Sequence, residues 1–372
     1  MIFYSVIPLI EYAKKINCPF VAAIGGKGNG KTYSAILYAL KEYFENGYIC
    51  RYLRRYDKTI TAKNIQSLCS PHKQDVINLS HGQYNGFKYW QNRFYLCRYD
   101  ENGNVEEKCK KPFMIASALN SVEMSTGADE GEISCIIYDE VLSREKELSD
   151  EFNSLMIFHS NCIRNRTDRY IPMILLGNTF TRKSILLHDF GVNLYNLKRN
   201  EITVIKNKNI PLICIEYCDT TDLMSSAGET YYKRFDNDKI KMIYQGNWTI
   251  SNYPHCSQQF IDNSDKIFTF HCLSPSKKML CCDVMQYDDK KPFLYVHLLT
   301  SDSDFDYRII YNKTGAFNAN ESNYIPNRGI FKHIQNMIFT RTCYFESNEV
   351  GEMFRDFLLS VANGQKLADV YK

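Results

Sequence analysis

Residues 20–32 read Phe-Val-Ala-Ala-Ile-Gly-Gly-Lys-Gly-Asn-Gly-Lys-Thr, and this stretch decides the fold of the chain around it. Its last eight residues match the phosphate-binding pattern G-x-x-x-x-G-K-[ST]. The apolar residues before the pattern predict a buried strand. Apolar side chains at helical spacing from Tyr33 to Phe44 predict an amphipathic helix that ends near Gly47. Because both flanks are correct, a chance glycine-rich turn is the weaker interpretation.

This loop predicts a nucleotide site. A strand, a glycine loop and a helix start direct several backbone N–H groups and the positive end of the helix dipole at one point. Glycines are needed because a Cβ atom would block the approach of the backbone to phosphate oxygens. Lys31 is expected to reach the β- and γ-phosphates of ATP and to act in catalysis, and Thr32 to bind Mg²⁺. The loop residues expected to hold the nucleotide are Gly25, Gly26, Lys27, Gly28, Asn29, Gly30, Lys31 and Thr32.

A second element completes the predicted site. Residues 133–138 form an apolar, β-type run that ends in Asp139 and Glu140, which is the Walker B arrangement when it follows a phosphate loop. Asp139 is expected to bind Mg²⁺, because this hard cation prefers oxygen ligands. Glu140 is expected to orient and polarise the attacking water. The consecutive acids favour hydrolysis over a nucleotide-kinase reaction.

An arginine follows the next predicted helix. Apolar side chains from Phe152 to Ile163 share one helical face, which also carries His159 as a packed or half-exposed histidine and not a ligand, and the helix runs into Arg164. An arginine in this place is suited to act as an arginine finger on the γ-phosphate of a neighbouring subunit. A surface ion pair or a helix C-terminal cap is the alternative. The same two interpretations apply to Arg166, and Arg144 is a lesser candidate for the finger.

Two further strand ends carry polar side chains. The strand at 171–176 is followed by Asn178, which could sense the γ-phosphate at the carboxyl edge of an open α/β sheet or could be a turn asparagine. The strand at 48–53 ends in Arg54 and Arg55, with Lys58 and Lys63 beyond it. This basic segment is either a contact for nucleotide or nucleic acid, or a solvated strand exit.

Composition narrows the possibilities. The chain has 372 residues, enough for two domains, and a net charge of +3, so nucleic-acid binding would depend on local patches. Its 14 cysteines lack C-x-x-C spacing, and with no secretory signal they predict a reducing compartment and buried thiols. His255-Cys256 and His271-Cys272 could form an accidental metal cluster, but ordinary packing is favoured. No apolar run approaches the ~20 residues that span a bilayer.

The pattern changes along the chain. Residues 1–218 predict an α/β domain with strands including 212–217, and 65–118 reads as an insertion. Residues 219–259 are polar and predict a linker with helical parts. Residues 260–372 predict a smaller domain with strands near 279–282, 293–300 and 307–311 and a final helix over 350–361.

Five stretches in this order resemble the DNA-packaging ATPases of the small protein-primed tailed phages, the phi-29-like group. They are the loop at 25–32, Arg-Tyr-Leu-Arg-Arg-Tyr at 51–56, Tyr-Asp-Glu-Val-Leu-Ser-Arg-Glu-Lys at 138–146, Ile-Arg-Asn-Arg at 163–166 and Leu-Gly-Asn at 176–178. The resemblance is specific through residues 20–180 and architectural beyond them.

The resemblance implies an ATPase domain of the additional-strand, catalytic-glutamate P-loop class. It implies a ring of five copies at the portal of an empty capsid, where ATP hydrolysis with Mg²⁺ drives double-stranded DNA inward, in the host cytoplasm. Arg164 falls on the trans-acting finger of the family, and a structural RNA is a further partner in some members. Other readings are a helicase, a nucleotide kinase, or a non-catalytic, ATP-gated assembly protein.

The second domain resembles an RNase H-like nuclease that has lost its activity. Its acidic candidates are Asp283, Asp302, Asp304 and Asp306, but no spacing establishes a metal pair, so cleavage is not expected. Residues 121–132 are acidic where the family would suggest DNA-facing basic residues. DNA contacts are therefore expected from Lys58, Lys63 or the lysines of the insertion.

Overall fold

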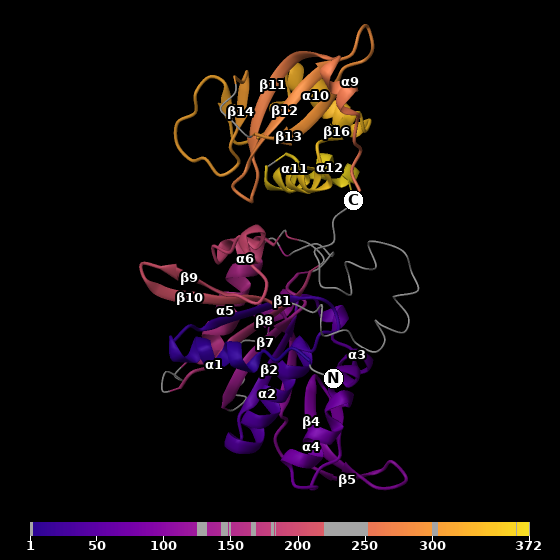
Figure 1. Cartoon of the computed structure of the whole chain (residues 1–372). Coiled ribbons are helices and arrows are strands. Elements are labelled where there is room, and N and C mark those ends of the chain that lie inside the picture. Colours follow the sequence, from indigo (N-terminus) through magenta and orange to yellow (C-terminus); the bar gives the residue numbers. More distant parts are fainter. Residues whose placement is uncertain are drawn as a thin grey trace. The chain divides into compact units, whose positions relative to one another are not determined.

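The computed structural model divides the chain into two compact units, Met1–Thr249 and Ile250–Lys372 (Figure 1). The structure describes residues 3–124, 132–142, 148, 150–164, 169–179, 182, 184–218, 252–299, 304–361 and 363–371. Most of the predicted linker, the centre of the acidic stretch at 121–132, and Arg144, Arg166 and Asp302 lie outside these residues. Among the described residues no helix is both long and apolar enough to cross a membrane.

The first unit is built on a ten-stranded sheet with the order β3-β4-β6-β2-β7-β8-β1-β10-β9, in which β5 pairs with β4. Its six central strands are parallel: β6 (Met114–Ala118), β2 (Ile49–Arg54), β7 (Ile133–Asp139), β8 (Met173–Asn178), β1 (Phe20–Gly25) and β10 (Ile210–Cys218). Antiparallel strands flank them: β3 (Gly86–Trp90), β4 (Arg93–Tyr99), β5 (Val105–Lys108) and β9 (Ile202–Asn207). The fold is therefore α/β with a mostly parallel sheet.

Helices cover both faces of this sheet, which explains why β1 and β7 are buried along their whole length. One core joins alternate strand residues such as Val21 to α1 (Ile7–Lys15), α2 (Lys31–Asn46), α3 (Ala62–Cys69) and α4 (Lys73–Leu79). The other joins the intervening residues, such as Ala22, to α5 (Glu151–Ile163) and α6 (Ile185–Asp189). The helix predicted after the loop is α2, and it ends at Gly47, whose φ is 72°.

The reading of 65–118 as an insertion is wrong at its carboxyl end. Strand β6 pairs in parallel with β2 and is part of the central sheet. Its sequence, Met-Ile-Ala-Ser-Ala, has one β-branched residue and no alternation, so its strand propensity is weak and its neighbours decide its conformation. The rest of the segment forms α3, α4 and the antiparallel strands β3, β4 and β5.

The second unit is a six-stranded sheet with the order β15-β14-β11-β12-β13-β16. The strands are β11 (Asp265–Leu273), β12 (Met279–Gln286), β13 (Phe293–Leu298), β14 (Tyr307–Ile309), β15 (Glu321–Ser322) and β16 (Cys343–Phe345). The helices are α9 (Gln258–Asp262), α10 (Ile330–Phe339), α11 (Asn348–Ser360) and α12 (Gln365–Ala368). Strands β11, β12 and β13 are antiparallel, whereas β14 is parallel to β11 and β15 to β14.

None of the 14 cysteines, all of which the structure describes, forms a disulfide bond, and 13 of them are buried. This confirms the prediction that the thiols pack as small apolar groups and do not form a disulfide framework.

Candidate nucleotide-binding site

A cavity of about 690 Å³ lies at the carboxyl edge of the parallel strands of the first unit. Open α/β sheets bind their ligands at this edge. The loop after β1 forms one wall, and the ends of β2, β7 and β8 form the others. Nine predicted site residues line the cavity: Lys27, Gly28, Asn29, Gly30, Lys31, Thr32, Asp139, Glu140 and Asn178.

The loop has a backbone that only glycine adopts easily. Gly28 and Gly30 have φ values of 79° and 104°, in the left-handed region. A Cβ atom on Gly30 would lie 2.9 Å from the Cβ of Phe3, and one on Gly25 would lie 2.8 Å from the carbonyl oxygen of Cys218. The chain therefore passes too close to its neighbours for a side chain at Gly25 or Gly30.

Lys31 is buried, and its ammonium group is held by the loop itself. Its Nζ donates to the carbonyl oxygens of Gly25 at 3.1 Å and Gly26 at 2.7 Å, and to Oδ1 of Asn29 at 2.9 Å. Burial lowers the pKa of Lys31 to about 8, against the opposing effects of Cys218 and Asp139. The loop thus holds its cation with neutral oxygens, which an anionic ligand could replace.

Asp139 at the end of β7 faces the first turn of α2. Its Oδ2 lies 3.4 Å from the hydroxyl oxygen of Thr32 and accepts a hydrogen bond from the hydroxyl of Tyr52 at 3.0 Å. Its Oδ1 accepts from the backbone N–H of Glu140 at 2.9 Å. A buried carboxylate beside a hydroxyl is an oxygen donor set that fits Mg²⁺. Residues 107 positions apart in sequence thus meet as predicted.

Arg54 connects the two acidic residues. It lies 3.6 Å from Oδ2 of Asp139 through one terminal nitrogen and 2.9 Å from Oε2 of Glu140 through the other. The sequence alone allowed two interpretations of Arg54, a contact for nucleotide or nucleic acid and a solvated strand exit. The structure places it in the wall of the cavity, with a side chain that is only 15% exposed.

Glu140 has an unusual backbone. Its φ of 62° is in the left-handed region, which a residue with a Cβ atom rarely adopts. Strained residues of this kind are concentrated at functional sites. The next residue, Val141, returns to the sheet by donating its N–H to the carbonyl oxygen of Leu176 at 3.0 Å. The half-exposed carboxylate of Glu140 lines the cavity.

A buried ionic network lies behind the acidic pair, and sequence reasoning missed it. Arg55 donates to both carboxylate oxygens of Glu151, at 2.8 and 3.0 Å, and to the carbonyl oxygen of Val141 at 2.9 Å. The hydroxyl of Tyr138 donates to the same carboxylate at 2.6 Å. These bonds connect the end of β2, the end of β7 and the start of α5. They fix the backbone on both sides of Asp139 and Glu140.

The third strand end contributes Asn178. It lies in the cavity wall directly after Gly177, where a Cβ atom would lie 2.7 Å from Cδ1 of Ile24. β8 can therefore approach β1 closely only with glycine at this position.

Arg164 is exposed at the C-terminal cap of α5 and is not among the residues that line the cavity. Among the described residues of the lining, Arg54 is the one arginine. Arg164 could therefore act as an arginine finger only at the nucleotide site of another copy of the chain.

A solved structure shares this fold over nearly the whole chain. A chain of the bacteriophage Phi-29 viral genome packaging motor assembly is 15% identical, with a TM-score of 0.54, and the alignment covers 97% of this chain and 100% of that one. The Phi-28 gp11 DNA packaging motor is 13% identical, with a TM-score of 0.49 and coverages of 97% and 98%. The N-terminal domain of the DNA packaging ATPase from bacteriophage phi29 is 20% identical, with a TM-score of 0.44, and covers 59% of this chain and 98% of its own.

No family model matches the sequence, and no curated protein matches it. The shared architecture therefore rests on three-dimensional structure, which persists at identities where sequence matching fails. The chain has the fold of a subunit of the bacteriophage Phi-29 genome packaging motor.

Proposed function

We propose that this chain is an ATP-driven motor that moves double-stranded DNA into a preformed viral capsid. The observation that carries the proposal is the convergence of Lys31, Thr32, Asp139 and Glu140 on one cavity. The proposal is also supported by the fold that this chain shares with a chain of the Phi-29 packaging motor assembly. The first unit would be a P-loop ATPase of the additional-strand, catalytic-glutamate class.

In this mechanism the loop after β1 holds the triphosphate, and Lys31 neutralises its β- and γ-oxygens. Thr32 and Asp139 would hold Mg²⁺, which would supply positive charge to stabilise the phosphate oxygens. Glu140 accepts a proton from the attacking water. Asn178 bonds to the γ-phosphate or the water, and Arg54 supplies a positive charge from the same chain.

We further propose that the working form is a homo-oligomeric ring, of five subunits by analogy with the phi-29-like group. Arg164 would complete the site of the adjoining subunit. The ring would act at the portal of the capsid in the host cytoplasm, and a structural RNA is a further candidate partner. Lys58, Lys63, Lys110 and Lys111 are exposed and are proposed to contact DNA phosphates.

The second unit is proposed to be an RNase H-like module without nuclease activity. Its support is the strand arrangement, with three antiparallel strands extended by β14 and β15 parallel to β11. It would follow a linker near residues 219–259 and contact nucleic acid or portal.

The test is ATP turnover by the full chain with duplex DNA and portal protein. Lys31→Ala is expected to abolish binding and turnover, whereas Glu140→Gln is expected to bind ATP without hydrolysing it. Lys41→Ala, which changes an exposed lysine of the same helix, is the matched control. Unchanged turnover in Glu140→Gln would contradict the proposal. Strand separation would indicate a helicase, and a phosphorylated product would indicate a kinase.

A further inference from the structure

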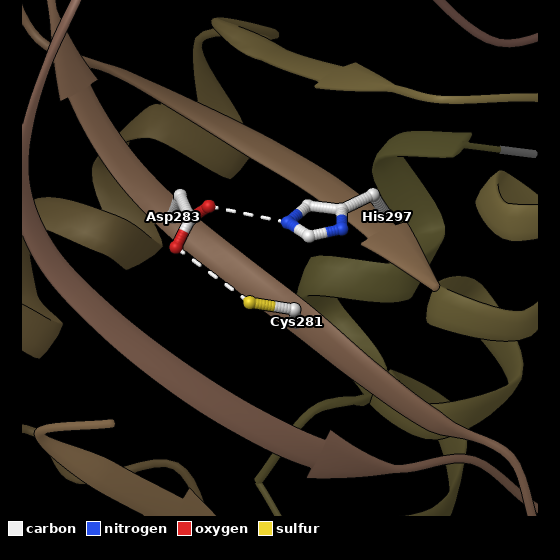
Figure 2. Close-up of side chains that lie close together, drawn as sticks. All are labelled: Cys281, Asp283 and His297. Atoms are coloured by element: carbon white, nitrogen blue, oxygen red, sulfur yellow. Dashed lines mark hydrogen bonds and ion pairs between the residues drawn. The ribbon is translucent and has the colours of Figure 1, made fainter. Parts of the chain in front are cut away.

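Three side chains of the second unit bring a thiol, a carboxylate and an imidazole together. Cys281 and Asp283 are two residues apart on β12, so they share one face of the sheet, and His297 on β13 is directly opposite Cys281. One donor atom from each residue lies within 4.8 Å of the other two. Figure 2 shows one oxygen of the Asp283 carboxylate facing the His297 imidazole and the other facing the Cys281 thiol.

This cluster lies on the face of the sheet opposite α10. The side chain of Phe270 on β11 points to the other face of the sheet and packs against Phe331 of α10. Thr269, the partner of Asp283 in the sheet, points to the cluster instead. Cys281 is 2% exposed and Asp283 is 3% exposed, so little water reaches either residue.

The imidazole is oriented as in metal sites. Nδ1 of His297 lies 3.1 Å from the carbonyl oxygen of Leu298, so this carbonyl would hold the remaining ring proton when a cation takes the place of the proton on Nε2. Nε2 faces the cluster, 3.1 Å from Oδ2 of Asp283. A second outer contact orients the carboxylate, because Thr269 donates its hydroxyl to Oδ1 of Asp283 at 2.7 Å.

We propose that Cys281, Asp283 and His297 form a binding site for a transition-metal dication, with Zn²⁺ as the best match. One sulfur, one nitrogen and one oxygen donor suit Zn²⁺ or Co²⁺, whereas Mg²⁺ and Ca²⁺ take oxygen donors. Three protein ligands leave a fourth position for water. The ion would connect β12 to β13, and this assignment does not depend on the function proposed for the first unit.

A positively charged group already lies beside the carboxylate. Nζ of Lys266 is 2.9 Å from Oδ2 of Asp283, and the lysine side chain is 52% exposed. A buried carboxylate requires a cation, and the long exposed lysine is able to leave when a dication replaces it. Lys266 is therefore expected to compete with the metal.

Cobalt provides a direct readout, because Co²⁺ bound to a thiolate absorbs in the near ultraviolet by charge transfer, whereas Co²⁺ bound by oxygen ligands does not. The full chain is stripped with a chelator and titrated with Co²⁺ and then with Zn²⁺. One equivalent of Co²⁺ is expected to produce the band, and Zn²⁺ to remove it. The candidate Mg²⁺ site of the first unit has oxygen ligands and would give no thiolate band with Co²⁺. The metal site proposed here is therefore tested separately from the function proposed for the first unit.

Variants identify the ligands. Cys281→Ser is expected to abolish the band, and Asp283→Asn and His297→Gln to weaken binding at least about tenfold. Lys266→Gln is expected to strengthen binding, and Cys256→Ser, which changes a partly exposed thiol of the same unit, to leave it unchanged.

Two results would overturn the proposal: no thiolate band in the wild-type chain, or a band that persists in Cys281→Ser. Persistence would point to another thiol, such as the pair Cys272 and Cys282, whose sulfur atoms are 3.7 Å apart. If Cys281→Ser does not fold, thermal unfolding with Zn²⁺ decides. A bound ion is expected to raise the melting temperature of the wild type more than that of His297→Gln, and equal shifts would contradict the site.

Discussion

At the scale of single residues, charge placement determines what the cavity of the first unit can do. Arg54 is the clearest case, because one guanidinium contacts both Asp139 and Glu140. Without it, two carboxylates would lie next to each other and next to a triphosphate. The Lys31 ammonium is hydrogen-bonded to its own loop and interacts with Asp139 only through longer-range electrostatics.

Arg54→Ala is expected to lower kcat/KM for ATP by about 10², because a preorganised cation at the developing charge is lost. Arg54→Lys is expected to recover only part of this, since an ammonium does not contact both acids. Steady-state ATP hydrolysis measures the effect, and an unchanged kcat/KM in Arg54→Ala would exclude a role in the reaction.

His159 is expected to make the first unit less stable in acid. Its ring packs against Phe20, with 4.9 Å between ring centroids, and burial lowers its pKa. The unfolded chain takes up this proton near pH 6.5 and the folded chain only at lower pH, so stability falls as pH drops below about 6.5. His159→Phe keeps the ring and removes the proton. Urea midpoints measured from pH 7.5 to 5 should fall less in this variant, and parallel curves would show that His159 does not contribute.

At the scale of elements, the Arg55–Glu151 pair joins β2 to α5. The side chains are 4% and 1% exposed, so each charge depends on the other. Glu151→Ala is expected to cost about 3–5 kcal/mol of unfolding free energy, because it leaves a buried arginine uncompensated. Chemical denaturation measures this cost.

The control for this prediction is Glu201→Ala, which breaks the exposed pair with Lys198 and should change stability by at most about 1 kcal/mol. The double variant Arg55→Met/Glu151→Leu should destabilise the protein less than Glu151→Ala alone, because it leaves no buried charge without a partner. Equal losses from the surface pair and the buried pair would contradict the assigned importance of burial.

The spacing of apolar residues predicted the strands and the helix that line the cavity. It did not predict elements whose conformation depends on their neighbours in the fold. β1, α2, β7 and β8 each carry a strong signal, with continuous apolar runs or clear helical spacing. α1 was not predicted; Pro8 lies in its first turn, where proline is tolerated. α10 was also missed.

The same contrast holds for the site. Lys31, Thr32, Asp139, Glu140 and Asn178 were predicted from strand ends and meet at one cavity; their roles in turnover stay predictions. Tyr52 and the Arg55–Glu151 pair were not found, because their partners lie 87 and 96 residues away and each residue reads as ordinary in its own segment. The cluster of Cys281, Asp283 and His297 was missed because it depends on the register of β12 against β13.

At the scale of the whole molecule, the proposed ring requires a site shared between subunits. Arg164→Ala and Glu140→Gln should each be inactive alone, the first by ~10³ or more if the finger is essential. Mixing them should restore turnover, because some interfaces then combine an intact Arg164 with an intact Glu140. DNA-stimulated ATP hydrolysis across mixing ratios measures this.

The control mixes Arg164→Ala with the double variant Arg164→Ala/Glu140→Gln, in which no interface regains the arginine and no turnover should return. Activity that is independent of the mixing ratio would argue against a shared site and favour a cavity completed within one chain.

The left-handed backbone at Glu140 has a consequence for engineering. A glycine there would relieve the torsional cost, of order 1–3 kcal/mol, that a side chain imposes. A library of this chain selected only for heat resistance would therefore be expected to enrich replacements at the residue proposed to activate water. Replacing Glu140 is therefore expected to raise thermal stability and to lower ATP hydrolysis, so a useful screen must select for both properties.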